Sequence, residues 1–300
     1  MDHVHSHLLR GPDGWVIVDT GLGLPVTRAR WEEVLAGLDE PVARIVVTHF
    51  HPDHVGGTGH LHDLTGAPVY QGELDQDVCR RVWGAADWAE RAVGWYARHG
   101  VPHDVAHQVV EEASRLHPHV RWPLRPETLA VGGRFEAAGE EWEAVHTPGH
   151  ADGHLCLFGT RTRRLLAGDH ILAPITPNIG VHPESRPDPL GDYLDSLARV
   201  AELRPTLALS GHGDPIADPA ARAAALAAHH EERLEATVRT LQAGELTAYE
   251  ASFGLFGGEL STHGRRFAVA ETLSHLIHLV TRGQAERVED AAGIRWCLSA

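Results

Sequence analysis

The chain has 300 residues, of which 26 are basic and 41 are acidic, so its formal net charge is −15 at pH 7. All 26 basic residues are arginine, because the sequence contains no lysine. This excludes Walker-type phosphate loops, protein kinases, pyridoxal-phosphate enzymes and hydrolases with a lysine-activated serine, all of which require a lysine. The 24 histidines point instead to metal binding, because histidine is the commonest metal ligand in proteins.

The sequence has the composition of a globular protein, with 43% hydrophobic residues. No apolar run is long enough to span a membrane, and the polar first ten residues do not resemble a signal peptide. We therefore expect a cytoplasmic protein without membrane association. Cys79, Cys156 and Cys297 are odd in number and far apart, which excludes a disulfide framework. The first predicted strand begins almost at residue 1, which leaves open an additional strand upstream.

Hydrophobic periodicity and turn residues predict a mixed order of strands and helices. A hairpin over 3–9 and 15–18 is followed by a helix that Thr27 caps and that ends near Leu38. Residues 73–117 have the pattern of two or three helices. Further strands are expected at 43–47, 68–70, 128–131, 134–137, 141–146, 154–158, 164–167 and 206–210. Later helices are expected at 190–203, 219–242, 247–253 and 262–281, and short strands at 286–288 and 294–298.

The composition changes at Asp218, where an Ala-, Glu- and Arg-rich helix begins. We therefore predict a catalytic domain over residues 1–218, with a helical insert at about 73–120, and a second part over 219–300. In this second part a linker helix precedes two helices and two short strands, which is the outline of a winged helix. Strands on both sides of the helical stretch predict two sheets faced by helices, an α+β fold.

The chemistry concentrates in THFHPDHVGG, directly after the strand at 43–47. His49 and His51 are two residues apart and can converge on one cation, whereas Asp53 and His54 point to a neighbouring position. This spacing favours two metal ions a few ångströms apart. Three later segments, HTPGH, GDH and SGHG, also follow predicted strands and can complete the ligand set.

These segments, in this order and after a strand that ends in VDTG, resemble the metallo-β-lactamase-fold hydrolase superfamily over roughly residues 3–217. The resemblance implies a four-layer αββα sandwich, here with a small C-terminal winged-helix domain. Asp19 matches a position that orients a ligand from behind. The metal ligands that the resemblance implies are His49, His51 and His150 on the first ion, Asp53, His54 and His212 on the second, and Asp169 bridging both.

Such a site predicts a hydrolase. Two cations that share a water lower its pKa, so that a metal-bridging hydroxide is the expected nucleophile. Asp53 and Asp169, next to cations, stay ionised and act as ligands and positioners. His170 and His182 are candidates to donate a proton or to bind substrate. Zinc suits the histidine-rich ligand set best, and iron or manganese also fits.

Two substrate classes remain open. A bridging Asp169 is similar to the glyoxalase II-like and nuclease branches. The helical insert, with Trp83, Trp88, Trp95 and Tyr96, can cover an acyl chain. We therefore expect a small-molecule thioester or related acyl ester of coenzyme A, glutathione or an acyl-carrier protein. The C-terminal segment differs from glyoxalase II and resembles the lactamase-β-like-2 branch, which is associated with RNA cleavage.

The alternative is therefore a metal-dependent endoribonuclease whose winged helix contacts RNA. The charge of −15 disfavours a nucleic-acid partner. The loose candidates for phosphate contacts are Arg10, Arg265, Arg266, Arg282 and Arg287. A transcriptional regulator with a vestigial metal domain is disfavoured, because every ligand position is filled. A homodimer is compatible with the sequence, in which the tail serves as a dimer or lid element.

Overall fold

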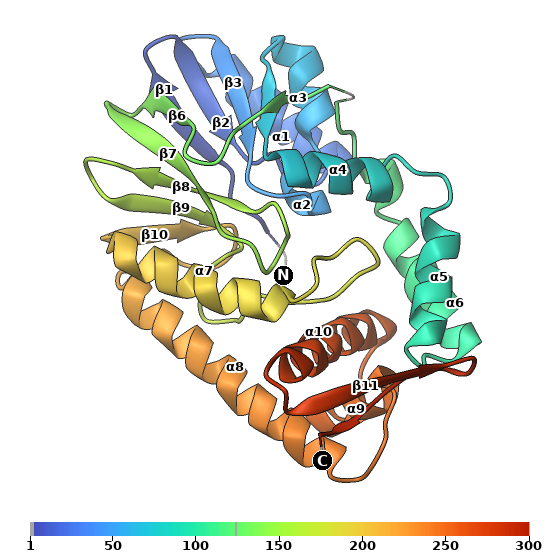
Figure 1. The fold of residues 1–300 in the computed structure, drawn as a ribbon. Coiled ribbons are helices and arrows are strands. Elements are labelled where there is room, and N and C mark those ends of the chain that lie inside the picture. The colour runs from blue at the N-terminus through green and yellow to red at the C-terminus, as the bar shows by residue number, and fades with distance from the viewer. Residues whose placement is uncertain (1–2, 124, 300) are drawn as a thin grey trace.

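The computed structural model describes residues 3–123 and 125–299. Two five-stranded sheets face each other, and helices cover the outer face of each sheet (Figure 1). This is the predicted four-layer αββα sandwich. Within the described ranges, no helix is both long and apolar enough to cross a bilayer.

The first sheet has the order β1-β2-β3-β4-β5. Its first two strands form the predicted hairpin, and the remaining neighbours pair in parallel. The strands are β1 (His7–Gly11), β2 (Gly14–Val18), β3 (Val42–Val47), β4 (Val69–Gln71) and β5 (Glu127–Thr128). The helices between them are α1 (Pro25–Ala36), α2 (Pro52–Val55), α3 (Thr58–Thr65), α4 (Glu73–Val82), α5 (Trp88–Arg98) and α6 (His103–Ser114), with a 3-10 turn at His117–His119.

The second sheet has the order β10-β9-β8-β7-β6. Only β10 and β9 pair in parallel, and the other neighbours are antiparallel. The strands are β6 (Arg134–Ala137), β7 (Glu140–His146), β8 (Leu155–Gly159), β9 (Arg164–Gly168) and β10 (Leu207–Ser210). Helix α7 (Pro189–Leu203) connects β9 to β10 and packs on the outer face of this sheet (Figure 1).

Strands β2, β3, β8 and β9 are buried on both faces over most of their length, which explains their nearly continuous apolar sequences. In β3, Val46 points between the sheets, where it joins a cluster with Trp142 and Leu157. Its neighbours Ile45 and Val47 point to the opposite face, among residues of α1 and α3. Side chains of a strand alternate between its faces, so this single run of β-branched residues packs against two layers at once.

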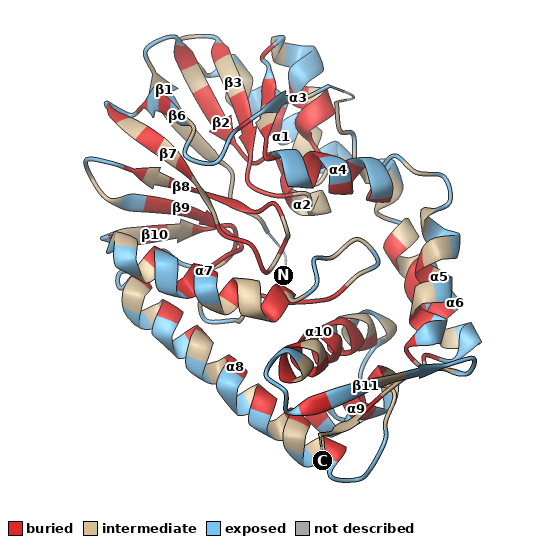
Figure 2. Ribbon diagram, viewed as in Figure 1, coloured by how far each residue is buried: buried red, intermediate tan, exposed pale blue. Residues whose placement is uncertain are grey.

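The C-terminal part consists of α8 (Pro219–Leu241), α9 (Ala248–Phe256), α10 (Thr262–Thr281) and the hairpin of β11 (Ala285–Asp290) and β12 (Gly293–Leu298). A capping box of Thr247 and Glu250 begins α9. Helix α10 is buried on nearly all sides (Figure 2), because α6, α7, α8 and α9 pack around it.

Two details of the sequence prediction were wrong. The first helix begins at Pro25, with Leu24 as its N-cap, so Thr27 lies inside the helix and does not cap it. Proline is preferred at the first helical position because its missing N–H needs no partner there. The strand expected at 128–131 comprises only Glu127–Thr128, because Leu129 already leaves the ladder after its N–H bonds to Gln71.

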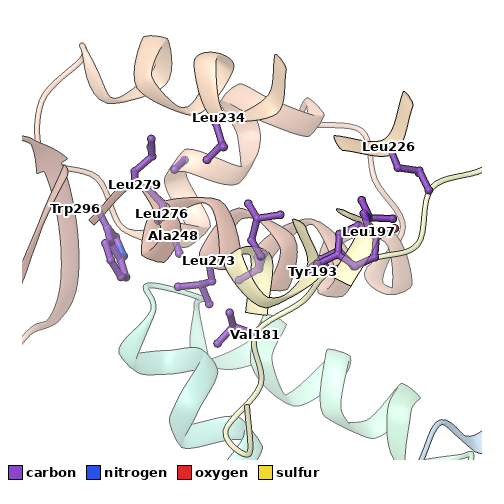
Figure 3. Packing of buried hydrophobic residues seen from close by; sticks show 14 of the residues in the cluster. Val181, Tyr193, Leu197, Leu226, Leu234, Ala248, Leu273, Leu276, Leu279 and Trp296 are labelled. Atoms are coloured by element: carbon purple, nitrogen blue, oxygen red, sulfur yellow. The ribbon is translucent and has the colours of Figure 1, made fainter. Parts of the chain in front are cut away.

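One hydrophobic cluster crosses the predicted boundary at Asp218. It joins Leu165 of β9 and Tyr193 of α7 to Leu276 of α10 and Trp296 of β12. Figure 3 shows these helices and the C-terminal hairpin meeting around the same apolar side chains. Because this core is shared, we expect the chain to unfold as one cooperative unit.

Leu276→Ala tests this shared core. Leu276 is completely buried, so truncation removes apolar contacts and leaves a cavity, and we expect a loss of about 2–5 kcal/mol in the free energy of unfolding. Urea unfolding followed by fluorescence and by circular dichroism gives this value. Val26→Ala, at a side chain that is 71% exposed, is the control and should change the free energy by less than about 0.5 kcal/mol. Two separate transitions in the wild type would contradict a shared core.

Candidate metal centre

Four loops meet at one edge of the two sheets. They follow β3, β7, β9 and β10, and each begins where its strand ends. Because these strand ends lie at the same edge, side chains from positions 49 to 212 come within reach of one another (Figure 1). Three overlapping groups there have donor atoms close enough to share an ion: His49, His51 and His150; His49, His54 and Asp169; and Asp53, His54 and His212.

The first group is the tightest. His51 Nδ1 lies 3.0 Å from His49 Nε2 and 2.8 Å from His150 Nε2. Burial and the neighbouring imidazoles lower the pKa of His49 and His51 well below the ordinary value. Both rings are therefore neutral at pH 7, the form in which an imidazole nitrogen can bind a metal ion.

The second group surrounds Asp169, which is only 4% exposed. Its Oδ1 lies 3.4 Å from His54 Nε2, and its Oδ2 lies 3.4 Å from His212 Nε2 and 3.6 Å from His150 Nε2. Asp53 Oδ2 is 3.2 Å from His212 Nε2. His54 Nε2, His212 Nε2 and Asp169 Oδ1 are buried without a hydrogen-bond partner. Donor atoms that surround a common ion at 2.0–2.2 Å lie about 3–4 Å apart, so this arrangement fits divalent metal ions.

The charges of the site favour a cation at its centre. Burial alone would raise the pKa of Asp53, but His54 and His212 outweigh it and lower the pKa to about 2. In the same way, His54 and His212 hold the pKa of Asp169 well below its ordinary value, against the effect of burial. The two carboxylates in turn raise the pKa of His212 to about 10, although burial lowers it. Two ionised carboxylates therefore attract positive charge to one point.

Oxygen atoms behind the site fix the orientation of the imidazoles. The Nδ1–H groups of His54, His150 and His212 donate to Asp19 Oδ2, the backbone carbonyl of Asn178 and that of His3, at 2.8, 2.9 and 2.6 Å. Each bond leaves Nε2 directed into the site, where it can bind a metal ion once its proton is displaced. This is the usual support of metal-binding histidines.

Asp19 is the centre of this supporting layer. It is buried, its φ is +59°, and it also accepts bonds from the backbone N–H and the hydroxyl of Thr48, both at 2.8 Å. The hydroxyl of Thr48 is in turn 3.0 Å from His49 Nδ1. One carboxylate thus orients His54 directly and His49 through Thr48.

Sequence reasoning missed three further supports. Asp75 at the start of α4 accepts bonds from the backbone N–H groups of Phe50 and Gly153, both at 2.8 Å, and so joins the loops of His51 and His150. His154 Nε2 accepts a bond from the backbone N–H of Asp169 at 3.1 Å. Only the recurrence of histidine in HTPGHADGH could have indicated His154, and nothing local indicates Asp75.

The third missed support comes from the C-terminal part. Asn178, whose carbonyl holds His150, donates its side-chain amide to Glu271 of α10 at 2.7 Å. Glu271 belongs to a buried group with His230 and His275, in which His230 Nδ1 is 3.3 Å from His275 Nε2. His275 Nδ1 donates to the backbone carbonyl of Glu271 at 2.7 Å. A polar network therefore connects α8 and α10 to the loop that orients His150.

The two candidates for proton donation lie in different places. His170 is fully buried, its ring faces Tyr193 at 5.4 Å, and burial lowers its pKa to about 3. Such a ring is uncharged at pH 7 and is not available as an imidazolium acid, which does not suit the expected role. His182 is half-buried in the loop between β9 and α7, and its pKa is lowered to about 4 by burial, Arg266 and His150. A neutral His182 beside the site can accept a hydrogen bond.

Asp19→Asn tests the supporting layer. An amide has one acceptor oxygen, whereas both carboxylate oxygens of Asp19 accept bonds from His54 and Thr48. We therefore expect metal affinity to fall about 10–100-fold. Competition with a chelator of known affinity measures this loss. Asp39→Asn is the matched control. This carboxylate is exposed, and among the described residues its side chain bonds to Arg10 and Trp15. An unchanged affinity in Asp19→Asn would show that the imidazoles need no such orientation.

Asp75 gives a pH-dependent prediction for the metal-free protein. Burial raises its pKa to about 7, against about 3.9 in an unfolded chain. The folded state therefore binds the proton more tightly, and this stabilisation is complete below about pH 4 and lost as the pH rises through about 7. In Asp75→Asn this contribution no longer changes with pH, so the wild type should lose stability relative to the variant between pH 4 and 8.

Urea unfolding at several pH values measures this difference. Asp77→Asn, at an exposed position of the same helix, is the control and should show no such trend. A stability difference between wild type and Asp75→Asn that does not vary with pH would contradict the raised pKa.

Comparisons with known proteins agree with this geometry. Residues 2–212 match the metallo-β-lactamase superfamily, and residues 234–297 match the metallo-β-lactamase-like C-terminal domain. A crystal structure of a metallo-β-lactamase family protein from Thermus thermophilus is 36% identical, with a TM-score of 0.86, and the match covers 98% of this chain and 93% of that one. A β-lactamase domain protein from Burkholderia ambifaria is 29% identical, with a TM-score of 0.87, over 99% and 88% of the chains.

Among curated proteins, a probable metallo-hydrolase of Bacillus subtilis (strain 168) is 28% identical over 261 residues, which are 83% of this chain and 79% of the relative. The lactamase-like protein adaB of Aspergillus niger is 26% identical over 282 residues, 92% and 67% of the two chains. The fold, the donor groups at one sheet edge and these matches lead to one conclusion. The chain belongs to the metallo-β-lactamase superfamily and has the fold of its metallo-hydrolases.

Proposed function

We propose that the protein is a dinuclear metal-dependent hydrolase of acyl thioesters, with zinc as its metal. The observation that carries the proposal is the sharing of Asp169 between donor groups on two sides. His49, His51 and His150 would hold the first ion, Asp53, His54 and His212 the second, and Asp169 would bridge them. Two such ions supply Lewis acidity that makes water nucleophilic at neutral pH and polarises a carbonyl group.

The chain's own residues support this reaction in two ways. Asp53 and Asp169 stay ionised, so they position cations and do not donate protons. The side chain of Asp53 is 37% exposed, which gives substrate an approach from this side of the centre. His182, half-buried in the loop after β9, would contact substrate as a hydrogen-bond acceptor.

Aromatic residues of the insert support an acyl substrate. Trp83 donates its indole N–H to the backbone carbonyl of Phe50 at 2.9 Å, and Phe50 packs against His51. The rings of Trp83 and Trp88 both pack against that of His117, and both tryptophans remain partly exposed. Partly exposed aromatic rings close to the metal centre suit an apolar acyl group.

Four of the five arginines that were candidates for phosphate contacts argue against RNA. Of the five candidates for phosphate contacts, Arg10, Arg282 and Arg287 pair with carboxylates, at 2.7, 2.6 and 2.5 Å. Arg265 is buried and bonds to Ser252 and to the backbone carbonyl of Gly257. Neutralised and buried arginines do not form the cationic surface that a nucleic-acid backbone requires.

Thiol release from a panel of acyl-coenzyme A and acylglutathione thioesters tests the function. We expect the zinc-loaded protein to bind two ions per chain and to hydrolyse at least one thioester. The double variant His51→Ala, Asp53→Ala should lose turnover by a factor of about 10³ or more, because it removes a ligand from each ion. Chelation should abolish activity, and added zinc should restore it.

His107→Ala is the control. This histidine is exposed on α6, and among the described residues its ring bonds to His103. The variant should therefore match the wild type. No thiol release from any thioester by the two-metal protein would overturn the thioesterase proposal. Cleavage of single-stranded RNA by the same preparation, absent in the double variant, would then favour the endoribonuclease.

A further inference from the structure

Arg266 differs from the other arginines near the site. It forms no hydrogen bond or ion pair with any residue that the structure describes, and its Nε is buried without a partner. Its guanidinium lies 4.5 Å from the centre of the Phe267 ring. A polar group that is buried without a partner is rare, because it loses its hydration without compensation.

Three segments converge around Arg266. Residues 266 and 270 lie one turn apart on α10, and the Ala270 carbonyl accepts a bond from the backbone N–H of Val181 at 3.0 Å, so this face of α10 packs against the loop that carries His182. That loop is tied to α5 by an ion pair of Glu184 with Arg91 at 2.6 Å. Burial raises the pKa of Tyr96 on α5 to about 12, and the charge of Arg266 acts against this shift.

His182 belongs to the loop that packs against this face of α10. Its ring is 6.3 Å from that of Trp95, and after burial the charge of Arg266 and then that of His150 are what lower its pKa. His182 is therefore uncharged at pH 7 and does not neutralise the charge of Arg266. Asn178, whose backbone carbonyl holds the candidate ligand His150, also donates its side-chain amide to the backbone carbonyl of Phe267 at 3.5 Å. Arg266 therefore adjoins the turn of α10 that contacts the loop behind the ligands of the first ion.

We propose that Arg266, with His182 beside it, binds an anionic oxygen group of the substrate, a carboxylate or a phosphate, away from the bond that is hydrolysed. A guanidinium suits this role, because its planar N–H groups match both anions in a bidentate manner. The substrates would then be acyl thioesters with a negative charge on the acyl chain or on the thiol carrier. This inference rests on the proposed thioesterase function.

Two matched pairs of thioesters separate the two sources of the anion. Glutaryl and valeryl thioesters of N-acetylcysteamine differ in the terminal carboxylate of the acyl chain. Valeryl-coenzyme A and valeryl-N-acetylcysteamine share the acyl chain, and only the former carries phosphates. We expect the wild type to prefer the anionic member of one pair, and Arg266→Gln to reduce that preference about tenfold or more, through KM rather than kcat.

Arg266→Lys should restore part of the preference, because it keeps the charge and loses the bidentate geometry. Arg164→Gln is the control and should leave both preferences unchanged. Arg164 is exposed on β9, and its side chain forms no ion pair with the residues that the structure describes. Arg266→Gln should also unfold at a temperature no lower than the wild type, because it removes an uncompensated charge. A marked loss of stability in Arg266→Gln would instead assign Arg266 a structural role.

Calorimetric titration with glutarate and with coenzyme A, on metal-loaded and metal-free protein, gives a readout besides turnover. We expect Arg266→Gln to weaken the binding of one of them about tenfold in both preparations. If thioesters are hydrolysed but Arg266→Gln changes neither preference nor binding, this inference is overturned and the thioesterase stands. If no thioester is hydrolysed but anion binding depends on Arg266, the thioesterase fails and the anion site stands.

Discussion

The structure depends on one electrostatic constraint. Asp53 and Asp169 keep their negative charge at the edge of the sandwich where the four loops meet. Asp169 is almost fully buried, and its Oδ1, which has no hydrogen-bond partner, lies 3.4 Å from His54 Nε2. Burying ionised carboxylates is costly unless positive charge compensates for them. Compensating cations must therefore be held in one place. The imidazoles around the carboxylates serve this purpose, together with the oxygens behind these imidazoles and the loops that carry both.

The part of this site that sequence could predict is the part that is contiguous or ends a recognisable strand. His49, His51, Asp53 and His54 lie within six residues after a β-branched strand, and their spacing alone indicates two ions. The supporting residues are different. Asp75 reaches Gly153 across 78 positions, and Asn178 reaches Glu271 across 93. Such contacts depend on how the layers pack, so no local pattern reveals them.

The same distinction holds for the fold. Alternation and apolar runs predicted the hairpin at the start and the two sheets, because a strand between two layers must be apolar on both faces. The surroundings of α10 were not predictable from its own sequence. Its buried positions include Glu271 and His275, which are polar, and only the partners from α8 and the loop at Asn178 explain their burial.

Helix α10 makes the C-terminal part more than an appendage. It supplies Arg266 to the surroundings of the centre, holds the Asn178 loop behind His150, and shares an apolar core with the second sheet. The segment that contains every candidate ligand therefore packs on residues that lie outside it. In terms of evolution, we expect the residues that contact each other across these two parts to change together among relatives, because an exchange of one part alone would require rebuilding the surface between them.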